Sequence, residues 1–298
     1  MAILKKVCFI INPKSGTGDW KGVEKSISTY LDKSFTATIL HTERPEHATE
    51  LAREAAKNHD VIVAVGGDGM MNETAIGMMN TNALLGIIPT GSGNALARHL
   101  GIPLSHKGAI ECINKINHQT IDTATVNGQA FFAIAGIGFD AEVAAKFAQS
   151  PKRGFSTYFK LSLTNFFTYK PAEYDIIVDG KTYREKAFLI SVANSSQYGN
   201  NAYIAPTASV QNGLLNVCIL KPFFWLKGVW LAYRLFTKSI HTSSSLKTLQ
   251  GKNIEIRNIQ KNDLSLHYDG ETGETANSMK FAIQPNTLKV ILPEGRKI

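Results

Sequence analysis

The sequence lacks the features of several protein classes. No stretch approaches the roughly 20 consecutive apolar residues of a membrane-spanning helix, so no transmembrane segment is expected. The first residues, MAILKKVCFIINP, do not combine a charged start, a long apolar stretch and a small-residue cleavage site, so no signal peptide is expected. The three cysteines, Cys8, Cys112 and Cys218, are far apart and outside any metal-ligand spacing. We therefore expect reduced, mostly buried thiols in a cytoplasmic protein.

The sequence also lacks a long basic run, although its net charge is +8. Lysines and arginines are scattered along the chain, which argues against a nucleic-acid partner. The positive balance favours anionic partners such as nucleotides or acidic lipid headgroups. With 298 residues, 44% of them hydrophobic, the chain is long enough for two globular domains.

The first third of the chain alternates strand and helix patterns. Apolar runs predict strands at residues 7–11, 35–40, 61–65 and 84–88, with helical stripes between them and a helix opened by Pro45. Such a βαβ series predicts a parallel sheet, whose ligands bind beyond the carboxyl ends of its strands.

The stretch VIVAVGGDGMMNE, residues 61–73, combines a buried strand, a glycine-rich turn and the start of a helix. The three glycines Gly66, Gly67 and Gly69 let backbone amides approach an anion, and the helix directs its positive end at the turn. Asp68 adds a carboxylate suited to Mg²⁺ or to a ribose hydroxyl. A tight turn without function is the alternative interpretation of this motif alone.

Two further strand ends carry loops of the same character, residues 11–18 and 89–103. The first offers Asn12, Lys14, Ser15 and Gly16 but lacks the glycine spacing of a Walker motif. The second contains Asn94, which can cap the following helix, and Gly101, which can end it. The residues expected at this loop's phosphate site are Thr90, Gly91, Ser92, Gly93 and Asn94.

From about residue 120 onward the patterns change to period-two alternation. Asn127-Gly128 and Asp179-Gly180 predict tight hairpin turns, and further strands are expected at residues 214–220, 254–257, 264–267 and 288–292. An antiparallel β-sandwich accounts for these signals. Two aromatic and basic segments, residues 151–170 and 222–238, interrupt the strands. They could border an acyl-chain pocket, rest on anionic lipid, or simply pack over the sandwich core.

Five motifs, INPKSGTG, VGGDGMMNE, PTGSGNALARHLGIP, GIGFDAEV and YDGE, together resemble the lipid kinase family of diacylglycerol and sphingosine kinases over nearly the whole chain. The resemblance implies an NAD-kinase-like α/β nucleotide-binding domain at residues 1–120 and a β-sandwich domain for the lipid acceptor at residues 121–292. It further implies that the tail, about residues 293–298, returns to the first domain. ATP and Mg²⁺ are the implied cofactors, and a lipid at the membrane surface is the implied substrate.

The resemblance also assigns roles to residues. Glu271 is expected to be the general base, with Asp269 as the fallback; if DGE is extended, both acids project on one face. A solvated acidic hairpin turn is the alternative. Asp68 and Asp269 are the expected Mg²⁺ ligands. The expected nucleotide-binding residues are Asn12, Lys14, Ser15, Gly16, Thr42, Gly66, Gly67, Asp68, Gly69, Asn72, Glu73, Thr90, Gly91, Ser92, Gly93 and Asn94.

The chain departs from the family pattern in two places. QNGLLNV places Asn212 and Asn216 where the family often has the aspartates of a structural Mg²⁺ site, and amides bind Mg²⁺ less well than carboxylates. Met70 replaces the threonine usual in diacylglycerol kinases, so the acceptor could be a sphingoid lipid. An NAD kinase and a non-catalytic nucleotide- or lipid-binding regulator are the alternatives. We expect a cytoplasmic protein that associates peripherally with membranes, and a homodimer is one expected assembly.

Overall fold

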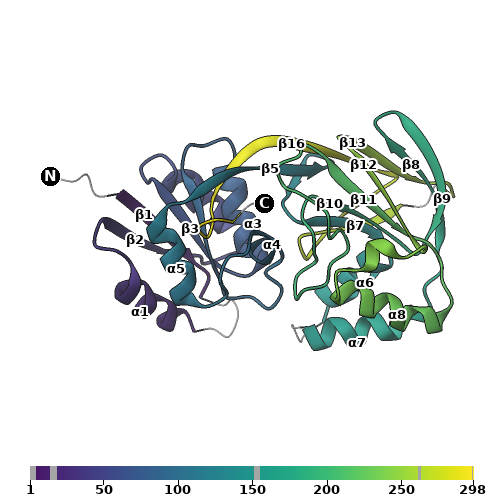
Figure 1. The fold of residues 1–298 in the computed structure, drawn as a ribbon, viewed down its shortest axis with the longest axis horizontal. Helices are drawn as coiled ribbons and strands as arrows, with labels where there is room; N and C mark the ends of the chain where they lie inside the picture. The colour runs from purple at the N-terminus through teal and green to yellow at the C-terminus, as the bar shows by residue number, and fades with distance from the viewer. Residues whose placement is uncertain (1–4, 14–18, 151–154, 261–262, 297) are drawn as a thin grey trace. The chain divides into compact units, whose positions relative to one another are not determined.

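The computed structural model describes residues 5–13, 19–150, 155–260, 263–296 and 298. The chain forms two compact units (Figure 1). The first comprises Met1–Asp122 and Pro285–Ile298, and the second Thr123–Gln284. Two strands, β5 (His118–Val126) and β16 (Ser278–Ile291), run from one unit into the other. The chain returns to the first unit at Pro285, earlier than the tail of about residues 293–298 that the family resemblance implies.

The first unit contains a parallel sheet with strand order β2-β1-β3-β4. Its strands are β1 (Lys5–Ile11), β2 (Phe35–His41), β3 (Val61–Gly66) and β4 (Leu84–Pro89). The end of β16 joins this sheet beside β4, where Val290 pairs with Leu85. Every residue of β3 is buried, as expected for a central strand with both faces covered. The four predicted strands and their parallel arrangement are confirmed.

Helices connect these strands, and the capping residues of two of them account for where a helix ends or begins. Bounds are α1 Trp20–Tyr30, α2 His47–Ala55, α3 Asp68–Met78, α4 Ala95–Leu100 and α5 His106–Lys115. Gly101 ends α4 in the left-handed conformation with φ 76°, as predicted. Helix α5 was not among the predicted elements, although Ser105 caps it by accepting from the amide of Gly108.

The second unit consists of two antiparallel sheets that enclose a common apolar core. One has the order β16-β13-β8-β9, with β5 paired to β16 and β6 paired to β5, and the other has the order β12-β11-β10-β7-β14-β15. Phe131 and Phe281 meet edge to face in this core, 6.4 Å between centroids. The bounds are β6 Gln129–Phe131, β7 Ile134–Gly138, β8 Ala172–Val178, β9 Lys181–Ala187, β10 Leu189–Ala193, β11 Leu215–Leu220, β12 Leu246–Gly251, β13 Asn253–Asn258, β14 Leu264–Tyr268 and β15 Glu271–Ala276. The predicted fold class is confirmed.

The two predicted hairpin turns are also confirmed. Asn127-Gly128 joins β5 to β6 and Asp179-Gly180 joins β8 to β9. Both residues of each pair have positive φ, near 50° and 85°, because a two-residue turn between twisted antiparallel strands requires it. The DGE motif contains a third such turn, between β14 and β15, at Asp269-Gly270.

The remaining helices of the second unit are α6 (Phe139–Ala148), α7 (Phe155–Phe166), α8 (Trp225–Phe236) and the 3-10 helix η1 (Ile240–Thr242). In the described part of the chain, no helix is long and apolar enough to cross a membrane. All three cysteines are free. Burial raises the pKa of the Cys8 thiol to about 11 and that of Cys218 to about 12, so both remain protonated.

Candidate functional site

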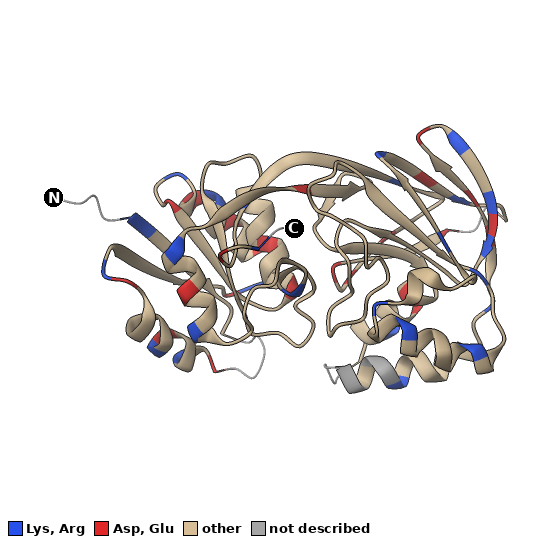
Figure 2. Ribbon diagram, viewed as in Figure 1, with Lys and Arg blue, Asp and Glu red and all other residues tan. Residues whose placement is uncertain are grey.

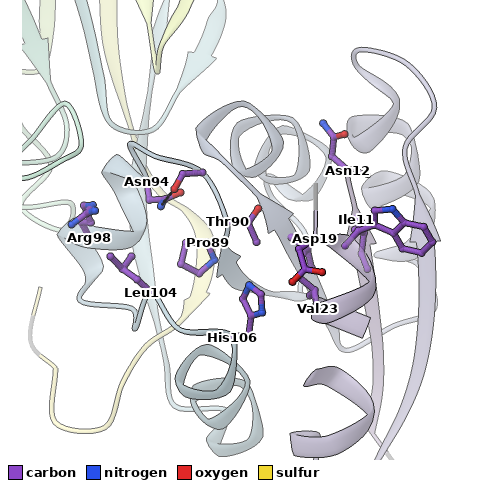
Figure 3. A pocket seen from close by; sticks show the side chains of 13 residues that line it. Ile11, Asn12, Asp19, Val23, Pro89, Thr90, Asn94, Arg98, Leu104 and His106 are labelled. Carbon is purple, nitrogen blue, oxygen red and sulfur yellow. Dashed lines mark hydrogen bonds between the residues drawn. The ribbon is translucent and has the colours of Figure 1, made fainter. Parts of the chain in front are cut away.

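A cavity of about 260 Å³ lies in the first unit, where Asn12 follows β1 and Thr90 follows β4 (Figure 3). Its position beyond the carboxyl ends of parallel strands is where ligands bind in open α/β sheets. The described residues that line it are Ile11, Asn12, Asp19, Trp20, Val23, Val65, Pro89, Thr90, Gly91, Asn94, Arg98, Leu104 and His106.

Beside the cavity, the glycine-rich turn at residues 66–69 packs against the loop at residues 90–94; we call these two segments the interlocked loops. The backbones approach so closely that a Cβ on Gly91 would lie 2.6 Å from the Cα of Gly67. The Asp68 carboxylate accepts the amide hydrogen of Asn94 at 2.8 Å and that of Ala95 at 2.6 Å. A Cβ on Gly93 would lie 2.6 Å from the same carboxylate. Glycine is therefore required at position 91 by the close approach of the two backbones.

Asp68 thus supplies the cap of α4 from a different loop. The Asn94 side chain makes no capping hydrogen bond to α4, so the prediction that Asn94 caps this helix is wrong. Asn94 is in the left-handed conformation with φ 52°, and its Nδ2 instead donates to the carbonyl of Gly91 at 2.6 Å. The two amides at the start of α4 are accordingly satisfied by a carboxylate of the protein.

Arg98 is a cavity residue that sequence reasoning missed. Its Nε donates to the carbonyl of Gly93 at 2.9 Å, and its side chain lines the cavity. The signal was present, because Arg98 stands one helical turn after Asn94 within the quoted motif GSGNALAR. Trp20 and His106, the first residues of α1 and α5, also line the cavity, and neither was a predicted site residue.

The structure brings only part of the predicted nucleotide-binding set to the cavity wall. Asn12, Thr90, Gly91 and Asn94 line it. Six others build the interlocked loops without being among the described lining residues: Gly66, Gly67, Asp68, Gly69, Ser92 and Gly93. Lys14, Ser15 and Gly16 lie outside the described residues.

Three further predicted residues have other surroundings. The Thr42 amide donates to the carbonyl of Ile11, one residue past the end of β2. Asn72 is buried on α3. Glu73 accepts the amide hydrogen of Ala48 at 3.1 Å, so its carboxylate stabilises the beginning of α2. None of the three is among the described residues that line the cavity.

The DGE motif has a different geometry from the extended one expected. Asp269 and Gly270 have φ 47° and 87° and form the turn of a hairpin, so the extended interpretation is wrong. The buried Asp269 carboxylate accepts three amide hydrogens, from Phe132 at 2.7 Å, Ala133 at 2.8 Å and Ile134 at 3.1 Å. Glu271, the first residue of β15, is exposed. The two acids thus lie in opposite environments.

A buried polar cluster supports the same hairpin. His267 Nε2 lies 2.9 Å from Asp140 Oδ2, and that oxygen also accepts from the hydroxyl of Tyr198. A Cβ on Gly136 would lie 2.6 Å from both the His267 and the Asp140 atoms, so this approach requires glycine. The sequence alone predicts no role for the residues of GIGFDAEV; in the structure Asp140 connects α6 to β14 through His267.

The QNGLLNV stretch uses both asparagines in protein hydrogen bonds. Asn212 Oδ1 accepts from the amide of Leu214 at 3.0 Å. Asn216 is buried, and its Oδ1 accepts from Gln250 at 2.9 Å. Among the residues that the structure describes, no group of three or more His, Cys, Asp and Glu side chains could hold a metal ion.

Comparisons with known proteins agree with this architecture. A family model described as the diacylglycerol kinase catalytic domain matches residues 6–126, and the YegS C-terminal NAD kinase beta sandwich-like domain matches residues 133–292. The chain is 32% identical over 226 residues to a diacylglycerol kinase of Bacillus subtilis, covering 73% of this chain and 74% of that protein.

Other relatives extend the match. A probable lipid kinase YegS-like protein of Pseudomonas putida is 27% identical over 98% of this chain and 96% of its own length. The crystal structure of a putative diacylglycerol kinase from Bacillus anthracis superposes with a TM-score of 0.83, at 24% identity over 100% of this chain and 98% of that one, which shows a shared fold. With both domains matched in order, the chain belongs to the diacylglycerol kinase and YegS-like family of lipid kinases.

Proposed function

We propose that this protein transfers the γ-phosphate of ATP to the hydroxyl of a lipid, either a diacylglycerol-like or a sphingoid one. The observation that carries the proposal is the cavity beyond the parallel strands, bounded by the loop that Asp68 fastens to the GGDG turn. Family membership supplies the reaction class.

The cavity offers groups suited to a nucleotide. Asn12, Thr90 and Asn94 provide polar side chains, and Arg98 provides a cation that can neutralise phosphate. Trp20 and Leu104 supply apolar surface for a base. The GGDG turn leads directly into α3, and the positive end of that helix suits the phosphate role proposed for the turn.

The acidic residues fit a Mg²⁺ ion that arrives with the nucleotide better than one held by the protein alone. Asp68 lies on the GGDG turn beside the cavity, where the nucleotide phosphates are proposed to bind, whereas the Asp269 carboxylate supports the backbone of residues 132–134. Mg²⁺ in kinases is typically bound by one or two carboxylates together with substrate phosphates. When bound, it would neutralise charge on the transferred phosphate.

For the acceptor hydroxyl, the proposed base is Glu271. A lipid hydroxyl does not ionise at neutral pH, so a carboxylate must accept its proton as the phosphoryl group transfers. Exposure leaves Glu271 able to meet a substrate, whereas the Asp269 carboxylate is occupied by the backbone of residues 132–134. Asp269 is then a positioning residue, which fixes the turn that presents Glu271.

A panel assay of ATP consumption tests the proposal. The protein is incubated with ATP, Mg²⁺ and, in turn, diacylglycerol, sphingosine, ceramide or NAD. Consumption stimulated by one of the lipids is the expected result. Stimulation by NAD alone would identify an NAD kinase, and nucleotide binding without consumption in any arm would identify a regulator; either outcome contradicts the proposal.

A further inference from the structure

Helix α8 presents large apolar side chains outward. Six of its twelve residues are large, apolar and between 45% and 73% exposed: Trp225, Leu226, Val229, Trp230, Tyr233 and Phe236. At 3.6 residues per turn these positions fall within an arc of about 140°. A surface helix ordinarily turns its polar side to water, so α8 has the reverse arrangement. We call these six residues the α8 face.

The opposite side of α8 is well packed, so the exposure does not come from a detached helix. Leu231 is 4% exposed and belongs to an apolar cluster with Ile240 and Leu246. A Cβ on Gly228 would lie 3.2 Å from the ring of Phe223 and 3.5 Å from that of Phe166 on α7. The α8 face is therefore held outward by the fold.

Helix α7 extends the apolar surface. Leu163 and Phe167, one turn apart, are 52% and 74% exposed. Phe166 links the helices, because its ring lies 5.7 Å from that of Phe223, which precedes α8. Contiguous exposed apolar surface of this kind marks a site of interaction with a protein or a membrane.

The charges around the α8 face favour an anionic surface. Residues 143–172 and 186–254, which include both helices, contain no aspartate or glutamate. In Figure 2, α8 carries basic residues and no acidic ones. Arg234 lies over the ring of Trp230 at 5.2 Å. Among the described residues, the cations of the two helices and their flanks are Lys160, Lys170, Lys221, Lys227, Arg234 and Lys238, of which Lys221 lies 3.9 Å from Glu185.

A second copy of the chain fits these charges less well. In a twofold contact the same patch faces itself, so basic residues such as Lys227 and Lys238 would oppose a partner that offers no carboxylate from the same segments. An anionic bilayer compensates the cations and receives the aromatic side chains at its interface.

We propose that the α8 face is a membrane-docking surface, with α8 lying in the plane of an anionic bilayer and its tryptophans inserted among the headgroups. The inference deepens the proposed lipid kinase function, since it names the surface by which the enzyme would reach a bilayer-resident acceptor. Docking is measured without nucleotide, so that docking and catalysis can fail separately.

The tryptophans make docking measurable. The chain has three, of which Trp225 and Trp230 lie on the α8 face and Trp20 lies in the first unit. In a Trp20→Phe protein, emission reports the α8 face alone. On adding vesicles of phosphatidylcholine with one quarter phosphatidylglycerol, we expect a blue shift and quenching by acyl chains brominated near the headgroup. Unchanged emission would overturn the proposal.

Substitutions test whether vesicle binding depends on the α8 face. Val229→Glu with Tyr233→Glu, which keeps both reporters, should weaken vesicle partitioning at least about tenfold, because two inserted side chains become charged. Ile39→Glu, at an apolar residue that is 37% exposed on β2 of the first unit, should leave partitioning unchanged. Lys227→Gln should weaken binding to anionic vesicles about fivefold and leave binding to neutral vesicles unaltered.

Light scattering after gel filtration measures the oligomeric state and so tests whether a second copy of the chain covers the α8 face. If the wild type is a dimer, the Val229→Glu, Tyr233→Glu variant is a monomer, and both partition equally onto vesicles, the face binds a second copy and the proposal is overturned. If vesicle binding falls in the variant while no lipid is ever phosphorylated, docking stands and the proposed kinase function fails.

Discussion

In the first unit the carboxylate of Asp68 accepts two amide hydrogens from residues 26 and 27 positions further along the chain, while in the second unit Asp269 accepts three from residues 135 to 137 positions earlier. Each motif aspartate therefore fastens a glycine turn to a distant segment. The neighbouring acids differ, because Glu73 accepts from the beginning of α2 whereas Glu271 is exposed on β15. The comparison teaches that the aspartate of each motif has a structural role in the backbone, and it separates that role from the catalytic one proposed for Glu271.

The largest expected effect is on turnover, and it comes from replacing Glu271, the exposed acid of the DGE motif. Glu271→Gln should lower turnover by ~10²–10⁴-fold and leave ATP affinity unchanged, since it removes a proton acceptor and no group of the first-unit cavity. Steady-state kinetics and calorimetric titration with nucleotide measure the two quantities. Glu274→Gln, an exposed acid on the same strand, is the matched control and should be fully active. Equal losses of turnover in Glu271→Gln and Glu274→Gln would contradict a specific role for Glu271.

Asp269→Ala should destabilise the protein by about 3 kcal/mol or more. It leaves three buried amides of residues 132–134 without their acceptor, and each orphaned buried donor is unfavourable. Urea unfolding measures the change. Glu271→Gln should stay within about 0.5 kcal/mol of wild type, as exposed substitutions do. A stable Asp269→Ala protein would show that the hairpin does not depend on this carboxylate.

Helix α4, whose start Asp68 caps, also carries an acid-sensitive residue. Burial lowers the pKa of His99 from 6.5 to about 4, and the positive charge of Arg296 adds to the shift. Between these values the unfolded chain binds a proton that the folded chain excludes, so stability falls as pH drops from 6.5 to 4 and is insensitive to this residue above 6.5. The difference is on the order of 3 kcal/mol.

Urea unfolding of a His99→Gln variant as a function of pH tests this. Its stability should change less than that of wild type between pH values of about 6.5 and 4. His118→Gln, at an exposed histidine of the same unit, should retain the wild-type profile. Identical profiles for wild type and His99→Gln would show that His99 does not limit stability in acid.

The smallest expected effect separates the two motif aspartates. Asp68 is only partly buried and supports two amides, so Asp68→Ala should destabilise the protein by about 1 kcal/mol, less than Asp269→Ala. It should nevertheless weaken nucleotide binding, because the loop bearing Thr90 and Asn94 loses its fastening. Thermal melts with and without ATP measure both. A larger loss of stability in Asp68→Ala than in Asp269→Ala would contradict the expectation that Asp269 is the more important structural carboxylate.

Much of the fold could be predicted from the sequence because its signals are local. The run Val61–Val65 is long enough in β-branched residues to mark a buried strand, and Asn127-Gly128 and Asp179-Gly180 mark hairpins by backbone sterics alone. At Asp269-Gly270 the same kind of dipeptide is present, and the hairpin turn given as the alternative for DGE is the one that the structure has.

Contacts between distant segments could not be predicted in the same way. Nothing near Asp68 indicates that its acceptors face the amides of Asn94 and Ala95, or that Glu73 faces α2. For α8 the periodicity of apolar residues is the same whether that side packs inward or faces outward. Only the packing of Gly228 and Leu231 shows which side is covered.

The fate of a labelled γ-phosphate tests the central claim most directly. The protein is incubated with γ-labelled ATP, Mg²⁺, NAD and mixed vesicles that contain diacylglycerol and sphingosine, and the label is followed into organic-extractable lipid, NADP and inorganic phosphate. The account predicts label in a phosphorylated lipid, lost in Glu271→Gln and retained in Glu274→Gln. Label in NADP or inorganic phosphate alone would contradict it.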